Sequence, residues 1–208
     1  MIAMSITGRW LCAAWLAAVL SLPAGSAPAQ EQATRIRGMV ESVEGSMLTV
    51  KTREGPSVQV DLAPGWTVSA LSRADLADIK AGTYVGTAAE PQPDGTLKAL
   101  EVLIFPEAMR GAGEGHRPWD LTPGSSMTNA TVEAAVAGVE GSVLTLSYKG
   151  GTQRVVVPAD APIVTPSAGD PSMIVPGAQV FIFANRQSDG SLTASRLTVG
   201  KDGLVPPM

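Results

Sequence analysis

Short runs in which apolar and polar residues alternate make up most of the chain. In the first run, Ile36, Gly38 and Val40 occupy every second position. The turn Glu44-Gly45 leads into the next run, and Glu54-Gly55 ends that one. Alternation of period two between glycine-containing turns is typical of β-hairpins and not of helices. The pattern predicts five strands in this half of the chain, near residues 35–43, 46–52, 57–62, 83–90 and 96–105.

One segment between these strands has the signature of a helix. Residues Ser72 to Asp75 resemble a capping box, with Asp75 in the place of the usual Glu or Gln. The spacing predicts a short helix over residues 72–80 that ends at Gly82. Its buried side would be formed by Leu71, Leu76 and Ile79.

The same pattern returns in the second half of the chain. Val43–Ser46 recurs as Val139–Ser142, 96 positions later, and Asp94-Gly95 recurs as Asp189-Gly190, 95 positions later. A nearly constant offset over about 60 residues, which includes turns and apolar positions, indicates an internal repeat. Asp170–Ile174 takes the place of the helix in the second copy, but it is shorter.

A lone sheet of this size would expose an apolar face and two edges. Closure into a small barrel removes both problems. We therefore predict an all-β protein with two tandem small OB-like β-barrels, the first of which contains a short helix. Residues 30–104 and 130–208 would form the barrels, and residues 105–129 would form a structured connecting loop.

With these turns and core positions, the repeats resemble an uncharacterised family of exported bacterial β-domains. That family is known only as a domain of unknown function, and its domains often occur in tandem. The resemblance covers residues 34–104 and 130–200. It implies the barrel fold and no particular chemistry, because the shared residues are turn and core residues.

Residues 1–29 have the layout of a secretory signal peptide. Arg9 precedes an apolar run from Trp10 to Leu22, and Ala27 and Ala29 fit the small-residue rule for cleavage. The alternative is a membrane anchor, but a run of roughly 13 residues is shorter than the ~20 that a spanning helix needs. We expect cleavage after Ala29, a periplasmic or secreted protein, and no membrane attachment after cleavage.

Composition limits the partners of the mature chain. Its formal charge changes from −4 to −5 when Arg9 is removed, and its basic residues are scattered. Nucleic-acid binding needs a clustered positive surface, so we expect no nucleic-acid partner. The single cysteine, Cys12, lies in the leader. The barrels must therefore be stabilised by their cores and not by disulfides.

The central stretch holds the only histidine of the chain, His116. Glu114 and His116 are two positions apart, so in an extended loop their side chains point to the same side. Asp120 could approach them across the following turn. Carboxylate oxygens and an imidazole suit zinc or another divalent ion. These three residues are the first candidate metal site.

A second candidate metal site uses sulfur. Met109 and Met127 flank His116 in the sequence, and Trp119 lies beside it. Thioethers with one imidazole favour Cu(I), and an indole face can add cation–π attraction. The composition is similar to that of small periplasmic copper carriers with OB-like barrels, although their ligand spacing is not reproduced.

The other interpretation is that the central stretch is a packed connector with a binding surface. Its glycines and prolines prevent a long helix, yet Phe105, Trp119 and Leu121 are too apolar for a free tether. Arg110 and Arg117 can pair with the carboxylates of the same stretch. A loop of this length with its own aromatic and charged residues is more often functional than not. Arg110, Arg117 and Trp119 are therefore the candidate binding residues.

Catalytic machinery is hard to assemble from this sequence. A Ser–His–Asp set would have to use His116 with Ser125 or Ser126, and no Gly-x-Ser-x-Gly elbow is present. We expect no enzyme activity. The function predicted from sequence is an exported, non-enzymatic binding or structural module, whose partner is a periplasmic protein or a small ligand. The alternative is a periplasmic zinc- or copper-handling protein.

Overall fold

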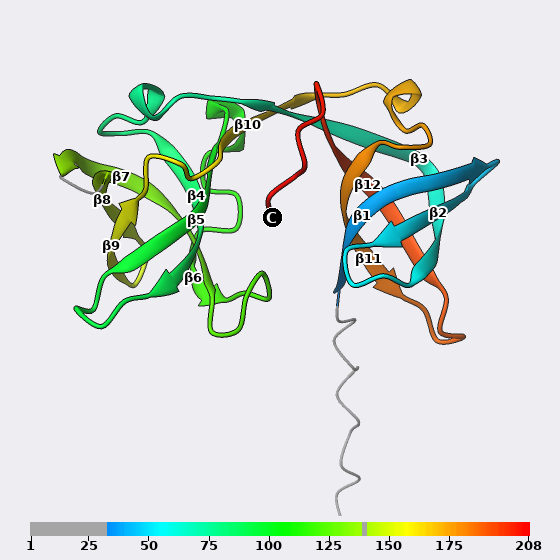
Figure 1. Cartoon of the computed structure of the whole chain (residues 1–208), viewed down its shortest axis with the longest axis horizontal. Coiled ribbons are helices and arrows are strands. Elements are labelled where there is room, and N and C mark those ends of the chain that lie inside the picture. Colours follow the sequence, from blue (N-terminus) through cyan, green and yellow to red (C-terminus); the bar gives the residue numbers. More distant parts are fainter. Residues whose placement is uncertain (1–32, 139–140) are drawn as a thin grey trace, which may run out of the picture. The chain divides into compact units, whose positions relative to one another are not determined.

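A computed structural model describes residues 33–138 and 141–208 of this chain, which belong to one compact unit. The proposed signal peptide and the repeat residues Val139 and Glu140 lie outside the described residues. The described part is all-β (Figure 1). Its strands are β1 Ala33–Glu44, β2 Met47–Thr52, β3 Ser57–Arg73, β4 Tyr84–Pro91, β5 Leu97–Ile104, β6 Gly115–Pro118, β7 Ser126–Gly138, β8 Gly141–Tyr148, β9 Gly151–Val157, β10 Ile163–Ala168, β11 Gln179–Arg186 and β12 Leu192–Gly200.

Five strands close into a mixed barrel, and seven further strands complete the fold. The order around the barrel is β1, β2, β3, β12 and β11, with β11 returning to β1. Only β3 and β12 pair in parallel. The alternating positions predicted from sequence point inward, because Val40, Leu48, Val60 and Ile182 all belong to one buried cluster. We call this set of strands the first barrel.

The strands β4, β5, β7, β8 and β9 repeat the same order of pairing. Here β5 and β9 take the parallel positions, with Leu97 opposite Val155 and Lys98 opposite Val156. A second buried cluster, which includes Val85, Leu144 and Val155, lies inside this set. We call it the second strand set. Leu48 and Leu144, 96 positions apart in the repeat, are both completely buried.

Each set combines strands from both repeats, which the sequence did not predict. The first barrel takes β1 to β3 from the first repeat and β11 and β12 from the second (Figure 1). The second strand set takes β7 to β9 from the second repeat and β4 and β5 from the first. The prediction assigned residues 30–104 to one barrel and residues 130–208 to the other. The strand pairing instead exchanges the last two strands of each repeat.

The physical reason for the exchange lies in β3, which runs for 17 residues without reversing direction. Its first half pairs with β2, and its second half pairs with β10. The crossing gains ladder hydrogen bonds with β10, whereas a fold back would need a reversal after Leu71, where the pairing of β3 with β12 ends. Leu71 lies opposite Pro166, its own counterpart under the 95-residue offset. A local two-fold axis therefore passes through this pair, as in exchanged dimers.

The two repeats differ by four residues in their first hairpin. The bulge after Val40 in β1 corresponds to the bulge after Val132 in β7, 92 positions later. Leu48 and Leu144 lie 96 positions apart, so the hairpin of β7 and β8 is four residues longer. For the residues that precede this bulge, an offset of 92 therefore relates β1 to β7.

The helix predicted over residues 72–80 is wrong. Ser72 lies in β3, and the only helical turn nearby is a 3-10 turn at Leu76–Asp78 with Asp75 as its N-cap. The carboxylate of Asp78 accepts a hydrogen bond from the Asp75 amide at 3.1 Å. Continuation of β3 consumes the residues that would have formed the first turn of the helix. No helix in the described residues is long and apolar enough to span a membrane.

Candidate functional site

A cavity of about 540 Å³ lies where the first barrel, the second strand set and the central stretch meet. Its walls are mainly apolar and aromatic. All three phenylalanines of the chain contribute to it. The main side chains that line it are Phe105, Met109, Arg117, Trp119, Met127, Asn129, Phe181, Phe183, Arg196 and Met208.

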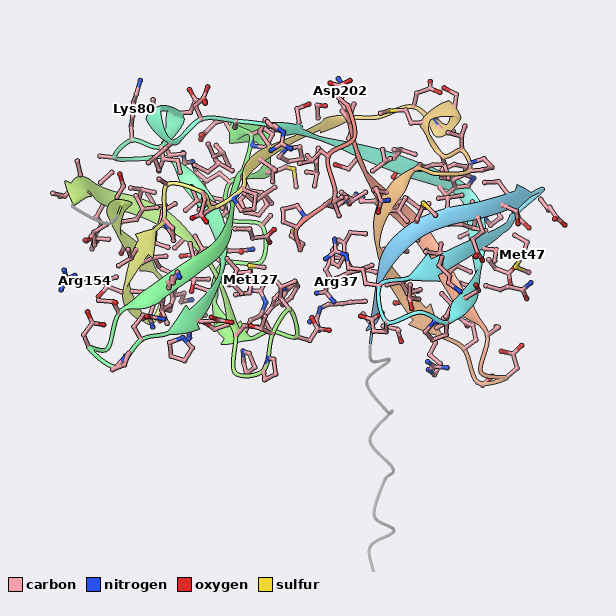
Figure 2. All side chains as sticks on the ribbon, viewed as in Figure 1. Arg37, Met47, Lys80, Met127, Arg154 and Asp202 are labelled. Atoms are coloured by element: carbon pink, nitrogen blue, oxygen red, sulfur yellow. The ribbon has the colours of Figure 1, made fainter. Side chains whose placement is uncertain are left out.

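The first barrel contributes a face of aromatic and basic side chains. On this face Arg35 lies opposite Phe183, and Arg37 lies opposite Phe181, because these residues are register partners of β1 and β11. The guanidinium of Arg37 lies 5.3 Å from the centre of the Phe181 ring. Phe181 is fully buried, whereas Phe183 is half-exposed. Arg37, labelled in Figure 2, marks this face.

The second strand set contributes a face with smaller and less charged side chains. In one row across β5, β4 and β7, Glu101 lies opposite Ala88, and Ala88 lies opposite Met127. Met127, labelled in Figure 2, is also the register partner of Arg117 on β6. Ala88 and Met127 share a buried cluster with Phe181 and Trp119. The two faces are therefore in contact through apolar side chains.

Trp119 is the central side chain of this contact, and only 8% of it is exposed. The guanidiniums of Arg35 and Arg117 lie 4.0 and 5.9 Å from its ring centre. The ring of Phe183 meets it edge-on at 6.3 Å. Such aromatic and cation–π contacts are each worth about 0.5–2 kcal/mol. The buried indole Nε1 has no hydrogen-bond partner among the described residues.

Asp120, next in the sequence, ties the central stretch to β1. Its carboxylate forms ion pairs with Arg37 at 2.7 Å and Arg35 at 3.2 Å. Burial alone would raise the pKa of Asp120. The hydrogen bonds and charges of Arg37 and Arg35 outweigh burial, so the net effect lowers this pKa. Asp120 is therefore a structural anion, and its negative charge is already neutralised by protein groups.

Two further arginines give the cavity a positive character. Arg117 donates to the carbonyl oxygen of Gly113 at 2.8 Å. Burial and the nearby charge of Arg35 lower the pKa of Arg117, so this guanidinium is incompletely compensated. Arg196 on β12 lines the opposite wall and is exposed. Neither arginine has an ion pair with a carboxylate within the described ranges.

Asn129 supplies a polar group between the aromatic walls. Its side-chain amide donates to the carbonyl oxygen of Ala112 at 3.0 Å. Its Oδ1 atom is buried and has no partner in the part of the chain that the structure describes. Gly86 keeps this side of the cavity open, since a Cβ atom there would lie 2.8 Å from that oxygen and 3.1 Å from the Phe105 ring. In the other repeat, the residue that corresponds to Gly86 is Phe181.

The three candidate metal ligands do not converge. Glu114 accepts a hydrogen bond from the amide of Lys149, and His116 is hydrogen-bonded through Nδ1 to the Thr128 hydroxyl at 2.8 Å. Asp120 is occupied by its two arginines. Residues 33–138 and 141–208 contain no group of three or more His, Cys, Asp or Glu side chains that could hold a metal ion.

The other candidate residues divide into two groups. Met109 and Met127, predicted as sulfur ligands, line the cavity, as do Arg117 and Trp119. His116 is not part of its lining; its ring stacks with that of Tyr148 at 6.3 Å. Arg110 lies outside the cavity, where it pairs with Glu107 at 2.6 Å.

Sequence reasoning missed the contribution of the first barrel to this site, namely Phe181, Phe183 and Arg196 in the lining, and Arg35 and Arg37, which contact aromatic rings of the lining. A comparison of the repeats could have found part of it. Under the offset of 95, Phe181 and Phe183 correspond to Gly86 and Ala88. Two bulky residues at outward strand positions in one copy, and two small residues in the other, indicate that the two faces differ in role.

No family model, curated protein or solved structure matches this chain. The resemblance to exported β-domains therefore stays a prediction.

Proposed function

We propose that this protein is an exported, non-enzymatic binding module that holds a small amphipathic organic anion in the cavity. The observation that carries this proposal is the lining, in which Arg117 and Arg196 accompany aromatic walls formed by Phe105, Trp119 and Phe183. Ligand sites are mostly apolar clefts of about 300–1,000 Å³ with a few polar groups that fix orientation. The cavity, at about 540 Å³, has this character.

The chemistry of the lining favours an anion over a cation or a neutral molecule. The carboxylate of Asp120, which follows the lining residue Trp119, is paired with Arg35 and Arg37. Arginine binds carboxylate, sulfonate and phosphate oxygens with two parallel hydrogen bonds. The unpartnered Nε1 of Trp119 and Oδ1 of Asn129 add a donor and an acceptor. An aromatic ring system with one acidic group would satisfy all of these features.

The OB-like interpretation of the barrel belongs to the same proposal. The first barrel has five strands in mixed pairing, and the 3-10 turn Leu76–Asp78 follows its third strand. Barrels of this kind present ligand sites on the outer surface of their strands and loops. The cavity lies on side chains of β3, β11 and β12 of the first barrel, and such a use fits this position.

The test uses 1-anilinonaphthalene-8-sulfonate as the probe, with the chain from residue 30 onward. At about −0.3 kcal/mol per non-hydrogen atom, a ligand of this size would bind with a Kd of tens of micromolar. We expect 1:1 binding by isothermal titration calorimetry, and quenching or energy transfer at Trp119 in the Trp66→Phe background. The tryptophans from residue 30 onward are Trp66 and Trp119, so in the Trp66→Phe background the signal comes from Trp119 in the cavity wall.

The double variant Arg117→Gln/Arg196→Gln tests whether these two arginines recognise the negative charge of the probe. Loss of charge-assisted hydrogen bonds worth about 1.5–3 kcal/mol each should weaken the probe by at least tenfold. The matched control is Arg154→Gln, an exposed arginine on β9 that does not line the cavity (Figure 2). The uncharged analogue N-phenyl-1-naphthylamine should bind more weakly than the sulfonate. Equal affinities of the double variant and the control for the sulfonate would overturn the proposal.

A further inference from the structure

Glu101 on β5 is a buried acid that the proposed binding site does not use. Its side chain is completely inaccessible to solvent. Both carboxylate oxygens are buried without a hydrogen-bond partner in the described residues. The charged groups that act on it are Arg37 from β1 and Arg53 from the turn after β2. Its register partner on β4, Ala88, and the partner of Ala88 on β7, Met127, carry no charge.

The two arginines direct hydrogen bonds to another part of the chain. Arg37 donates through Nε to the main-chain oxygen of Met208 at 2.5 Å, and Arg53 donates to the main-chain oxygen of Pro206. These oxygens belong to residues 204–208, which we call the closing segment (Figure 1, red). Arg37 also holds Asp120 at 2.7 Å.

The closing segment is anchored at its start by Leu204, and Pro206 is buried further along. Leu204 is buried in a cluster with Leu71, Leu103 and Val164. The Leu204 amide closes a turn on the carbonyl oxygen of Lys201. Beyond that point Val205 is exposed. The two arginine hydrogen bonds and the packing of Met208 against the cluster of Trp119 and Phe181 hold the rest.

The closing segment and an ionised Glu101 would therefore compete for the guanidiniums of Arg37 and Arg53. A buried carboxylate without a partner is strongly disfavoured when ionised. Arg37 and Arg53 are the charged groups that could stabilise the ionised form, but the closing segment binds one nitrogen of each guanidinium, Nε of Arg37 and Nη2 of Arg53. If residues 205–208 leave, both guanidiniums become available to Glu101, and water can reach it. Two arrangements of the same side chains are thus available, one with a neutral Glu101 and one with an ionised Glu101.

We propose that the last four residues of the closing segment, 205–208, act as a strap over the cavity. Ionisation of Glu101 releases this strap. The proposal rests on the proposed function, because Met208 forms part of the cavity wall and its departure would widen the entrance. Ligand and strap then compete for the same space. The strap is displaced when Glu101 carries its charge and is closed when Glu101 is protonated.

The direction of the pH effect follows from linkage. Burial raises the pKa of Glu101 to about 8, although the charges of Arg37 and Arg53 act to lower it. With the strap released, the pKa returns toward the ordinary Glu value of about 4.3. The closed state therefore binds the proton more tightly. Closure is fully favoured below about pH 4 and is lost progressively as the pH rises through about 8.

The strap itself is observed by NMR of methionine methyl groups labelled with carbon-13. The Met208 resonance is assigned by its loss in Met208→Leu. Between pH 5.5 and 8.5 we expect it to move from a ring-shifted, buried position toward the position of an exposed methionine. Glu101→Gln should stay in the buried position at both values of pH, and Glu133→Gln, an exposed glutamate on β7, should behave like the wild type. A Met208 methyl that ignores pH in the wild type, or that moves equally in Glu101→Gln, would overturn the proposal.

Arg53→Gln provides a second perturbation that leaves the buried acid in place. It removes the hydrogen bond to Pro206, so the Met208 methyl should be exposed even at pH 5.5. A buried methyl in this variant at pH 5.5 counts against a strap held by the arginines.

Coupling to the cavity is measured with 1-anilinonaphthalene-8-sulfonate, which keeps its charge over this range. Apparent affinity falls with the fraction of the open state, so the probe should bind about tenfold more tightly at pH 8.5 than at pH 5.5. In Glu101→Gln the difference should disappear. Binding that is independent of pH in the wild type refutes the strap but leaves the binding site intact. Absence of binding at every pH refutes the proposed function, whereas the methyl resonance still decides whether the segment moves.

Discussion

The exchange of strands between the repeats can be tested with one engineered disulfide. Met39 on β1 and Gln179 on β11 are register partners, and neither is fully buried. If the repeats did not exchange strands, β11 would instead pair with β7, and Gln179 would face Thr131. This follows because Thr131 corresponds to Met39 under the offset of 92. The pair Met39→Cys/Gln179→Cys should therefore oxidise, and the pair Thr131→Cys/Gln179→Cys should not.

The geometry and the expected stabilisation follow from the register. Residues opposite each other in an antiparallel pair have Cα atoms about 4.5–5.5 Å apart, within the range of about 4.4–6.8 Å that a disulfide accepts. The bond between residues 39 and 179 would close a loop of about 140 residues. The chain-entropy model gives about 5 kcal/mol for such a loop, and measured values are typically 2–4 kcal/mol. At about 2–4 °C per kcal/mol for a chain of this size, Tm should rise by roughly 10 °C.

Non-reducing electrophoresis, peptide mapping and thermal melts with and without reductant provide the measurement. The chain expected after cleavage contains no cysteine of its own, so the introduced thiols are the only ones present. The result that refutes the exchange is a monomer cross-linked between residues 131 and 179 with free thiols in the other variant. A disulfide between positions 39 and 179 that forms only between two molecules would also refute exchange within one chain.

Two further predictions concern stability. Leu48→Ala and Leu144→Ala should each cost about 2–5 kcal/mol, because both side chains are completely buried. Urea unfolding should remain a single transition in both variants, since every strand set contains segments of both repeats; two separate transitions would contradict this. Asp120→Asn should cost about 0.5–1 kcal/mol at pH 7 through weaker bonds to Arg35 and Arg37, because solvent screens the exposed half of this carboxylate. Because these arginines lower the pKa of Asp120, that difference should vanish as the pH falls below about 4; an equal difference at pH 2 and pH 7 would show that the ion pairs are not its source.

Sequence reasoning predicted the inward positions of the strands well, because alternation records only which side of a strand is buried. Ile36, Val40, Leu48 and Leu144 all lie in buried clusters as their spacing requires. The helix was predicted wrongly for a related reason. Ser72 fits a helix cap, but the same residues can extend a strand, and pairing of β3 with β10 decided between the two.

The exchange of strands could not be predicted from alternation. Exchanged and unexchanged barrels bury equivalent residues, since β4 and β11 are copies of the same strand. The two arrangements differ only in the path after Leu71, where the pairing of β3 with β12 ends and the chain continues across instead of turning back. A repeat detected in sequence therefore predicts how many strand sets exist, but not which copy supplies each strand. Only the connecting segment carries that information.

The site depends on the differences between the repeats and not on their likeness. Three outward positions of the first barrel hold Arg35, Phe183 and Arg196, and the corresponding positions of the second strand set hold Met127, Ala88 and Glu101. Bulky cationic and aromatic groups on one face thus meet smaller or acidic groups on the other. A perfectly symmetric pair would bring arginine to arginine and phenylalanine to phenylalanine, and like charges and crowding would separate the faces. Divergence at positions that do not affect either core has therefore made room for a cavity, and it has placed Glu101 among arginines that the closing segment also requires.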